Sequence, residues 1–281
     1  MRILVTNDDG ITAPGIGHLA RAMEGLGEIV VIAPNREFSG AGAAIGAIWE
    51  SHPSVQRVDF DGAAEAWAVD GPPALCAMYA RFGAFGDPFD LIVSGINPGA
   101  NVGRSVYHSG TIGACISGRN GGIPGIAVSQ AAAGWGVEGQ AWHEVLALQK
   151  WETAATVARA FVEGFISEPP EHVVVANVNV PNVELDEIAG WARTEVGMRP
   201  PRSMSKARLE PRMLPDGPST DTFDIVVDWG GPEDLPADTD GGAIERNLVS
   251  VTYLSTLHAE ARDDLRKAEA ALDVLLTERS R

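Results

Sequence analysis

Short apolar runs alternate with helix-like or glycine-rich stretches along the first 180 residues or so. Several of these runs are continuous, which is typical of strands covered on both faces in a parallel sheet. The pattern predicts strands at residues 3–5, 29–32, 66–69, 89–93, 126–128 and 173–178. It predicts helices at about 14–26, 73–82, 111–119 and 141–165. This alternation implies right-handed crossovers and an α/β fold with a doubly wound, mainly parallel sheet.

The pattern changes after Pro181. Five prolines between residues 199 and 221 are too many for a compact helical layer. Short strands are predicted at 223–227 and 248–253. The tail at 258–276 predicts an amphipathic helix, with apolar residues spaced by four and three at Ala261, Leu265, Ala268, Leu272 and Leu275. Such a helix needs a surface to pack against, in its own subunit or a neighbouring one.

Composition narrows the class of protein. The 281 residues carry a formal charge of −17, and the isoelectric point near 4.7 argues against a nucleic-acid binder, which needs a cationic surface. No window approaches the roughly 20 apolar residues of a membrane span. Only Cys76 and Cys115 are present, so we expect buried packing cysteines without a disulfide framework, and a cytoplasmic protein. The strand-like opening, with no leader pattern, supports the same expectation.

Two adjacent carboxylates stand where the first predicted strand stops, in Asn7-Asp8-Asp9-Gly10. Gly10 permits a tight turn there, and ligands of open α/β sheets bind beyond the carboxyl ends of the strands. Like charges side by side repel, and a nearby cation removes that cost. Carboxylate oxygens favour Mg²⁺, Mn²⁺ or Ca²⁺ over zinc. The alternative is a solvated turn in which one Asp caps the following helix.

Two later strand ends carry matching chemistry. The second predicted strand runs into a small-residue loop with Arg36 and Ser39. The strand at 89–93 runs into a loop that contains Asn97, and the next helix opens at Ser109-Gly110-Thr111. Backbone amides at a glycine-containing helix start form an anion site, which the helix dipole favours. The three strand ends together predict carboxylates, a hydroxyl, an amide oxygen and a cradle of phosphate size.

Six groups of residues carry a family resemblance. They are Ile3-Leu4-Val5-Thr6-Asn7-Asp8-Asp9-Gly10; Ala33-Pro34-Asn35-Arg36 through Ser39-Gly40-Ala41; Val93-Ser94-Gly95-Ile96-Asn97 with Gly99-Ala100-Asn101-Val102-Gly103; Ser109-Gly110-Thr111-Ile112-Gly113-Ala114; Asn177-Val178-Asn179-Val180-Pro181; and Thr239-Asp240 with Val249-Ser250-Val251-Thr252. They occur in this order over nearly the whole chain. The sequence resembles the SurE family of survival-protein nucleotidases.

The resemblance implies a Rossmann-like fold in two parts. Residues 1–185 correspond to a SurE-like α/β phosphatase domain. Residues 186–281 correspond to a C-terminal extension with a β-hairpin arm and a terminal helix, which we expect to serve oligomerisation as a homodimer or homotetramer.

The resemblance also implies an activity, that of a divalent-metal-dependent phosphomonoesterase acting on nucleoside 5′- or 3′-monophosphates. One Mg²⁺ or Mn²⁺ per subunit is expected, in a site that Ca²⁺ can also fill. The implied residues are Asp8 and Asp9 as catalytic groups, Asp8, Asp9, Ser39 and Asn97 as metal ligands, and Asn97, Ser109, Gly110 and Thr111 as phosphate contacts. Neither duplex nucleic acid nor a membrane is expected as a partner. Whether a water or a carboxylate attacks phosphorus first stays open, as does the proton donor.

Some residues depart from the family pattern. Arg104 and Ser105 stand where acidic residues are common, and His108 replaces a common Tyr. Arg36, Arg104 and His108 could contact phosphate, or His108 could donate a proton. The alternative is a surface arginine and a histidine that packs in place of the aromatic ring. These departures affect the expected substrate more than the reaction.

A basic strip follows at residues 193–212, against an acidic whole. Its basic residues are Arg193, Arg199, Arg202, Lys206, Arg208 and Arg212. Such a strip attracts phosphorylated substrates. Alternatively, a hairpin arm pairs with acidic residues of another subunit, and candidates are Asp228, Glu233, Asp234, Asp238 and Asp240.

The sequence also has features of other classes of protein. Gly15-Ile16-Gly17-His18-Leu19-Ala20 fits a dinucleotide-binding pattern but stands about ten residues past the strand end. A zinc deacetylase needs histidine ligands near its paired Asp, and Asn7 stands there instead. Two related alternatives are a family member that binds nucleotide without turnover and a phosphatase for a non-nucleotide phosphomonoester.

Overall fold

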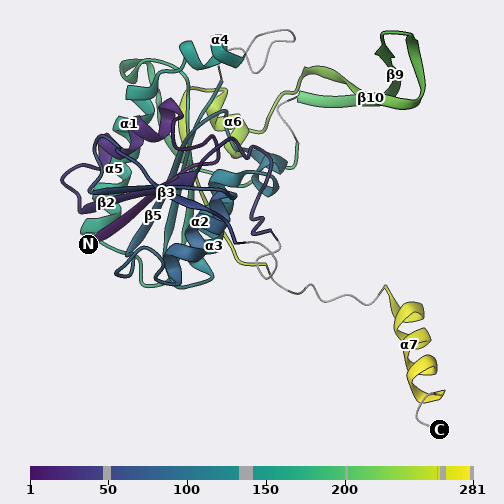
Figure 1. Ribbon diagram of the computed structural model, residues 1–281, viewed down its shortest axis with the longest axis horizontal. Coiled ribbons are helices and arrows are strands. Elements are labelled where there is room, and N and C mark those ends of the chain that lie inside the picture. Colours follow the sequence, from purple (N-terminus) through teal and green to yellow (C-terminus); the bar gives the residue numbers. More distant parts are fainter. Residues whose placement is uncertain (47–51, 133–141, 200–201, 258, 260–263, 279–281) are drawn as a thin grey trace.

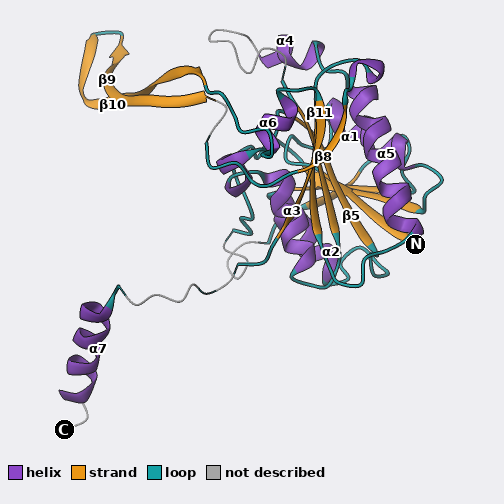
Figure 2. Cartoon of the chain, turned by 180° about the vertical axis from the view of Figure 1, so that it is seen from behind, coloured by secondary structure: helices purple, strands orange, loops and turns teal. Residues whose placement is uncertain are grey.

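The structure is a computed structural model that describes residues 1–46, 52–132, 142–199, 202–257, 259 and 264–278. In these ranges the main sheet has the strand order β3-β4-β2-β1-β5-β6-β7-β11-β8, and β9 and β10 form a separate hairpin arm. Figures 1 and 2 show helices on both faces of the twisted sheet. The predicted α/β, doubly wound, mainly parallel fold with a C-terminal hairpin is confirmed.

The bounds of the elements follow from the backbone. The main-sheet strands are β1 Arg2–Thr6, β2 Glu28–Pro34, β3 Val55–Arg57, β4 Glu65–Val69, β5 Leu91–Pro98, β6 Gly125–Gln130, β7 Val175–Val180, β8 Gly190–Arg193 and β11 Leu248–Leu254. The arm consists of β9 Arg202–Leu214 and β10 Gly217–Pro232. The helices are α1 Pro14–Met23, α2 Pro73–Arg81, α3 Gly110–Arg119, α4 Trp142–Ala147, α5 Trp151–Ser167, α6 Asp240–Ile244 and α7 Arg266–Glu278, with 3-10 turns η1 Gly103–Tyr107 and η3 Leu185–Glu187.

The centre of the sheet determines where a ligand can bind. Strands β4, β2, β1, β5, β6 and β7 run parallel, while β3 at one edge and β11 towards the other are antiparallel to their neighbours. The strand order reverses between β1 and β5, because β2 and β4 follow on one side of β1 and β6 and β7 on the other side of β5. Ligands of such sheets bind at this switch point, beyond the carboxyl ends of the strands.

Alternating strand residues build a core on each face of the sheet. Ile3 and Val5 of β1 face α1 and α5, where Trp151 and Leu19 are buried. Leu4 faces α2 and α3, among buried side chains that include both Cys76 and Cys115. The two cysteines are free and fully buried, as predicted, and burial raises the pKa of both thiols.

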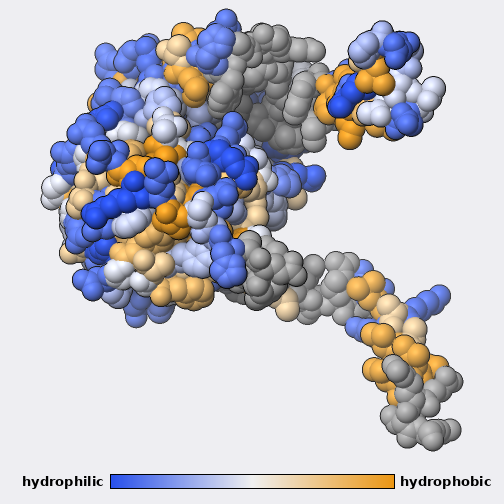
Figure 3. All heavy atoms as spheres, viewed as in Figure 1, coloured by the Kyte–Doolittle hydropathy of each residue, from blue (hydrophilic) through white to orange (hydrophobic). Residues whose placement is uncertain are grey.

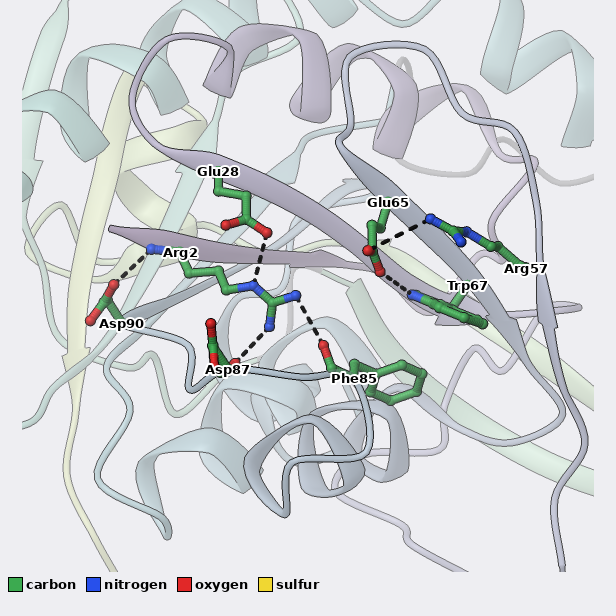
Figure 4. A network of polar contacts seen from close by, with 8 residues as sticks. All are labelled: Arg2, Glu28, Arg57, Glu65, Trp67, Phe85, Asp87 and Asp90. Carbon is green, nitrogen blue, oxygen red and sulfur yellow. Dashed lines mark hydrogen bonds and ion pairs between the residues drawn. The ribbon is translucent and has the colours of Figure 1, made fainter.

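Arg2 fixes the start of β1 (Figure 4), and Asp8 follows the other end of this strand. The Nε of Arg2 contacts Glu28 Oε1 on β2 at 3.1 Å, and its Nη1 and Nη2 donate to the carbonyl oxygens of Asp87 and Phe85. Its backbone N–H donates to Asp90 Oδ2 at 2.7 Å. These contacts hold the strand in register, so that its other end has a defined position.

Residues beyond 185 contribute to the same sheet. Strand β11 pairs antiparallel with β7, and β8 pairs with β11 as the edge strand. The arm and α7 stand apart from the sheet body (Figure 1). Prolines are tolerated in the arm because an isolated two-stranded ribbon has unpaired outer edges, and Pro215 and Asp216 form its turn.

Two residues of the basic strip, Arg208 and Arg212, have ion-pair partners within the arm. Arg208 donates to Asp228, and Arg212 donates to Asp224 Oδ1 at 2.6 Å. Asp240, which the sequence offered as a partner for another subunit, is instead fully buried in its own chain. The expectation of pairing with another subunit is therefore wrong for Asp240.

Some predicted bounds differ from the structure. The predicted helix at 141–165 is two helices, because Lys150 between them donates its N–H to Asn182 Oδ1 and accepts at its carbonyl from Gln130 Nε2. Residue 141 lies outside the described residues. The predicted tail helix at 258–276 begins only at Arg266, and residues 258 and 260–263 lie outside the described part of the chain. In that part, no helix has the length and apolar character needed to cross a membrane.

Candidate functional site

The predicted site residues come from adjacent strand ends at the switch point. Strands β2, β1 and β5 are neighbours. The segments that follow their last residues, Pro34, Thr6 and Pro98, therefore meet at one edge of the sheet. The loop after β2 is joined to the end of β1, because Phe38 N donates to Asp8 O at 2.7 Å. Gly10 has a φ of +100°, and a Cβ there would lie 3.2 Å from the backbone of Arg36. The predicted tight turn therefore requires a glycine at this position.

Asp8 is held against the start of α3. Its side chain is buried, and its Oδ1 accepts the hydroxyl of Thr111 at 2.6 Å. Gly110 makes the approach feasible, since a Cβ there would lie 2.7 Å from Asp8 Cβ. Burial raises the pKa of Asp8, while the Thr111 hydroxyl and the amides of Thr111 and Gly110 lower it. The structure therefore brings together Asp8, Gly110 and Thr111.

Asp9 lies beside Asp8 in a less enclosed position. Its Oδ2 is buried and has no hydrogen-bond partner among the described residues. Burial, followed by the negative charges of Asp8 and Glu37, raises the pKa of Asp9 to about 8. A cavity of about 170 Å³ adjoins Asp9 and is lined by Glu37, Pro98, Leu146 and Trp151 among others. The site therefore contains a buried carboxylate oxygen that needs a proton or a cation.

Ser39 and Glu37 form the part of the site that comes from the loop after β2. The Ser39 hydroxyl is exposed and donates to Glu37 Oε1 at 2.8 Å, so it contacts Glu37 rather than an aspartate. Glu37 was not among the site residues predicted from the sequence. The signal that could have indicated it is a carboxylate two residues before the predicted ligand Ser39.

Asn97 stands at the end of β5, next to the cavity residue Pro98. Its Nδ2 donates to the carbonyl of Gly99 at 2.6 Å. The N–H of Gly99 in turn donates to Gln130 O at 2.7 Å, at the end of β6. This backbone geometry holds the loop that follows Asn97 against the neighbouring strand.

Buried amides fix the next part of this loop. Asn101 N donates to Asn179 Oδ1 at 2.7 Å, Asn101 O accepts from Asn177 Nδ2 at 2.8 Å, and Asn101 Nδ2 donates to Ser129 Oγ at 2.9 Å. Asn177, Asn179 and Ser129 are fully buried on β7 and β6. No role was predicted from the sequence for Asn177 and Asn179. Their signal was two asparagines alternating with valines in an apolar strand.

The start of α3 is packed closely against the loop after β2. Ser109 caps the helix, and its Oγ accepts from Ile112 N at 3.1 Å. Gly42 N donates to His108 O at 2.9 Å, and a Cβ on Gly113 would overlap the Gly42 carbonyl. The predicted anion cradle therefore lies beside the loop that carries Ser39.

Arg36 and His108, the two further candidates for phosphate contact, have other partners or are exposed to solvent. The Arg36 guanidinium lies 4.3 Å from the Phe38 ring centroid and 3.8 Å from Asp70 Oδ1, and the side chain is exposed. His108 and Arg104 are exposed, and Ser105 Oγ donates to Val102 O at 2.7 Å. A phosphate role for Arg36 or His108 stays a prediction.

The donor set was tested for a divalent cation. Within the described ranges, no three His, Cys, Asp or Glu side chains gather as a metal cluster. The predicted set is different, since it combines two carboxylates with a hydroxyl and an amide. The unpartnered Asp9 Oδ2 and the raised pKa of both aspartates favour a positive charge at this position, so the residues fit a cation. Oxygen donors of this kind suit a hard cation such as Mg²⁺ or Mn²⁺.

Comparisons with known proteins identify the family of the chain. Residues 3–203 match the family model described as "Survival protein SurE". The chain belongs to the SurE family. Among its relatives, "5'-nucleotidase SurE" of Legionella pneumophila strain Philadelphia 1 is 35% identical and aligns over 94% of this chain and 96% of its own length. The protein of the same name from strain Corby is 34% identical over the same shares.

The fold comparison supports the same family. The crystal structure of the SurE protein from Aquifex aeolicus has a TM-score of 0.67 and 30% identity to this chain, and covers 97% of it and 100% of the Aquifex chain. The predicted SurE family is confirmed. Gly15, the first glycine of the sequence that mimics a dinucleotide-binding pattern, has a packing role instead, because it lies inside α1 and a Cβ there would overlap the Ile96 carbonyl.

Proposed function

We propose that this chain hydrolyses nucleoside 5′- or 3′-monophosphates to nucleoside and phosphate, with one divalent cation per subunit. The observation that carries the proposal is the pair of carboxylates, Asp8 and Asp9, at the switch point beside the start of α3. Two relatives named 5'-nucleotidase SurE, alike over almost the whole chain, support this choice of substrate.

The cation is held by Asp8, Asp9, Ser39 and Asn97. Glu37 adds negative charge at Asp9 and keeps the Ser39 hydroxyl in place. When bound, Mg²⁺ or Mn²⁺ neutralises charge that develops on the phosphoryl oxygens. The two aspartates must be ionised to bind it. Burial raises the pKa of Asp8, and burial together with the negative charges of Asp8 and Glu37 raises the pKa of Asp9.

The start of α3 receives the phosphoryl group. The amides of Gly110 and Thr111 lie at the positive end of the helix dipole, and Ser109 holds the first turn in shape through its cap. Asn97 offers an amide at the end of β5. The nucleoside lies towards the cavity of about 170 Å³ beside Asp9, whose Leu146 and Trp151 give it an apolar side. Ligand sites are commonly about 300–1,000 Å³, so this cavity takes only part of the nucleoside.

The arm and α7 serve self-association into a homodimer or homotetramer. One face of the arm is apolar, since Ile225 pairs with Leu209 and Phe223 with Pro211, and Ile225 and Leu209 are 71% and 66% exposed. Figure 3 shows apolar residues on the arm and along α7. An isolated two-stranded ribbon is marginally stable in water, which favours a second copy as the cover for this face. A cytoplasmic location stays a prediction.

The test is a phosphate-release screen over 5′- and 3′-nucleoside monophosphates and sugar or aryl phosphomonoesters, with Mn²⁺, with Mg²⁺ and with chelator. Release from nucleotides that chelator abolishes supports the proposal. Release only from other phosphomonoesters identifies a different phosphatase. Nucleotide binding without release identifies a binding protein. Release that persists in chelator contradicts the role of the cation.

A further inference from the structure

Asp240 is a buried carboxylate that joins three segments of backbone. Its side chain is fully buried at the start of α6. Oδ2 accepts from Gly103 N at 2.8 Å, and Oδ1 accepts from Gly197 N at 3.0 Å and from Gly241 N at 2.8 Å. Burial raises the pKa of Asp240, and these amides lower it. A buried carboxylate is costly unless its oxygens have partners, so the three amides and the carboxylate require one another.

One of these segments leads into the candidate site. Gly103 is the first residue of η1, which ends at Tyr107, two residues before the α3 cap Ser109. Gly103 has a φ of +56°, and a Cβ there would lie 3.1 Å from the carbonyl oxygens of Gly197 and Arg199. The start of η1 therefore touches the chain just before the arm directly, as well as through Asp240.

The second segment is the root of the hairpin arm, between β8 and β9. Glu195 forms an isolated parallel bridge with Thr239. Its N–H donates to Asp238 O at 3.1 Å, and its carbonyl accepts from Asp240 N at 2.9 Å. The backbone and the side chain of Asp240 thus both form hydrogen bonds with the segment 195–197.

The same loop is held from its other side by buried amides. Asn101, two residues before Gly103, is held by hydrogen bonds with Asn177 and Asn179 of β7. The loop from Asn97 to Ser109 is thus held on the main sheet at Gly99 and Asn101, on the arm root at Gly103, and on the loop after β2 at His108. Gly103 is where the arm root holds the start of η1, and η1 is joined to the α3 cap because the carbonyl of Ser105 accepts from His108 N and Ser109 N.

From these contacts we infer that Asp240 is a positioning residue: it fixes the start of η1 to the root of the arm, and so sets the place of Ser109-Gly110-Thr111. Its effect on turnover rests on the proposed function, because Asp240 acts on phosphate through Gly103 and η1. Its effect on the loop does not depend on any reaction.

The test compares Asp240→Asn with a matched control. One carboxamide oxygen cannot accept on both sides, and its NH₂ would face an N–H donor. Thr194→Val is the control, since Thr194 is also buried in the C-terminal part, and its hydroxyl contacts Ser250 and Thr252 of β11 at 2.8 and 2.7 Å. If Asp240→Asn does not fold, Asp240→Ser replaces it, because a hydroxyl can turn to avoid a donor clash.

Two readouts distinguish positioning from general stability. Hydrogen–deuterium exchange of residues 103–111 should be at least about tenfold faster in Asp240→Asn and unchanged in Thr194→Val, as expected for a lost hydrogen bond to a charged group. The inhibition constant of inorganic phosphate and the KM for a nucleotide should rise by a similar factor in Asp240→Asn alone. Unchanged exchange and phosphate inhibition, or equal changes in both variants, would overturn the inference. If the wild type releases no phosphate, the proposed function fails while the exchange result still decides the role of Asp240.

Discussion

The hydroxyl of Thr111 donates a hydrogen bond of 2.6 Å to Asp8 Oδ1, and this bond joins the end of β1 to the first turn of α3. The contact is fully buried, and it opposes the effect of burial on the Asp8 carboxylate. A hydroxyl has one proton to donate. While Asp8 accepts this proton, the Thr111 hydroxyl cannot also donate to a phosphate oxygen at the start of the helix.

Thr111→Val tests this relationship. Valine keeps the shape but leaves the buried Asp8 oxygen without its donor, so we expect kcat for a nucleoside monophosphate to fall about tenfold or more, and the free energy of unfolding to fall by about 1–3 kcal/mol. Thr111→Ser, which retains the hydroxyl, should restore most of the activity. Steady-state kinetics and urea unfolding measure both effects. A valine variant with the wild-type kcat would show that the hydrogen bond does not matter for turnover.

Asp9 makes the metal-free protein less stable as pH rises. Its pKa is raised from 3.8 to about 8, so between these values the folded state keeps a proton that the unfolded state has lost. This contribution to stability is fully present below pH of about 4 and is lost as pH rises through about 8. In chelator, Tm should therefore decline from about pH 5 to about pH 8 in the wild type and decline less in Asp9→Asn. Equal declines in the two proteins would rule out Asp9 as the source.

Mn²⁺ should reverse the loss at the higher pH, because a cation takes the place of the proton. The same thermal scans at about pH 8, with Mn²⁺ in place of chelator, measure this. Asp9→Asn is the control, and it should gain much less from the metal.

Gly113→Ala should separate the loop after β2 from α3. The added Cβ would overlap the Gly42 carbonyl, a backbone atom that cannot turn away. We expect a loss of about 1–3 kcal/mol in the free energy of unfolding, together with a large loss of activity. Gly164→Ala is the control, since Gly164 lies in α5 with open space around its Cβ position; there alanine should be neutral or stabilising by up to about 1 kcal/mol. Equal stabilities of the two variants in urea unfolding would contradict the close packing.

Ile225→Lys should disrupt self-association through the arm. The residue is exposed on the apolar face of the ribbon, opposite Leu209. Sedimentation analysis should show a smaller assembly than the wild type forms. Asp224→Asn changes the charged face, where Arg212 is its partner, and should leave the assembly intact. An unchanged assembly in Ile225→Lys would exclude this face as a contact.

The elements that were predictable share one physical property. Strands β1, β2, β5, β6 and β7 are buried on both faces, so their continuous apolar runs are visible in the sequence. Strands β3 and β8 were missed because they are edge strands whose residues are mostly exposed and carry no apolar pattern. The break between α4 and α5 depends on Asn182 and Gln130, which reach Lys150 only after folding.

The site residues also divide into those that the sequence locates and those that depend on contacts formed on folding. Asp8, Asp9 and Asn97 could be located from strand ends, because adjacent parallel strands bring their carboxyl ends together. Glu37 and Asp240 could not be assigned in this way. Their roles arise from contacts with Ser39 and Gly103, and for Asp240 the partner lies 137 residues away.

Calorimetric titration of chelator-treated protein with Mn²⁺, in the wild type and in Asp8→Asn and Asp9→Asn, tests most directly whether the paired aspartates hold a cation. We predict one ion per subunit in the wild type, with binding that strengthens as pH rises towards 8 as Asp9 loses its proton. Each variant should bind at least about tenfold more weakly, with its circular dichroism unchanged. Equal Mn²⁺ affinity in the wild type and both variants would contradict a metal site at Asp8 and Asp9.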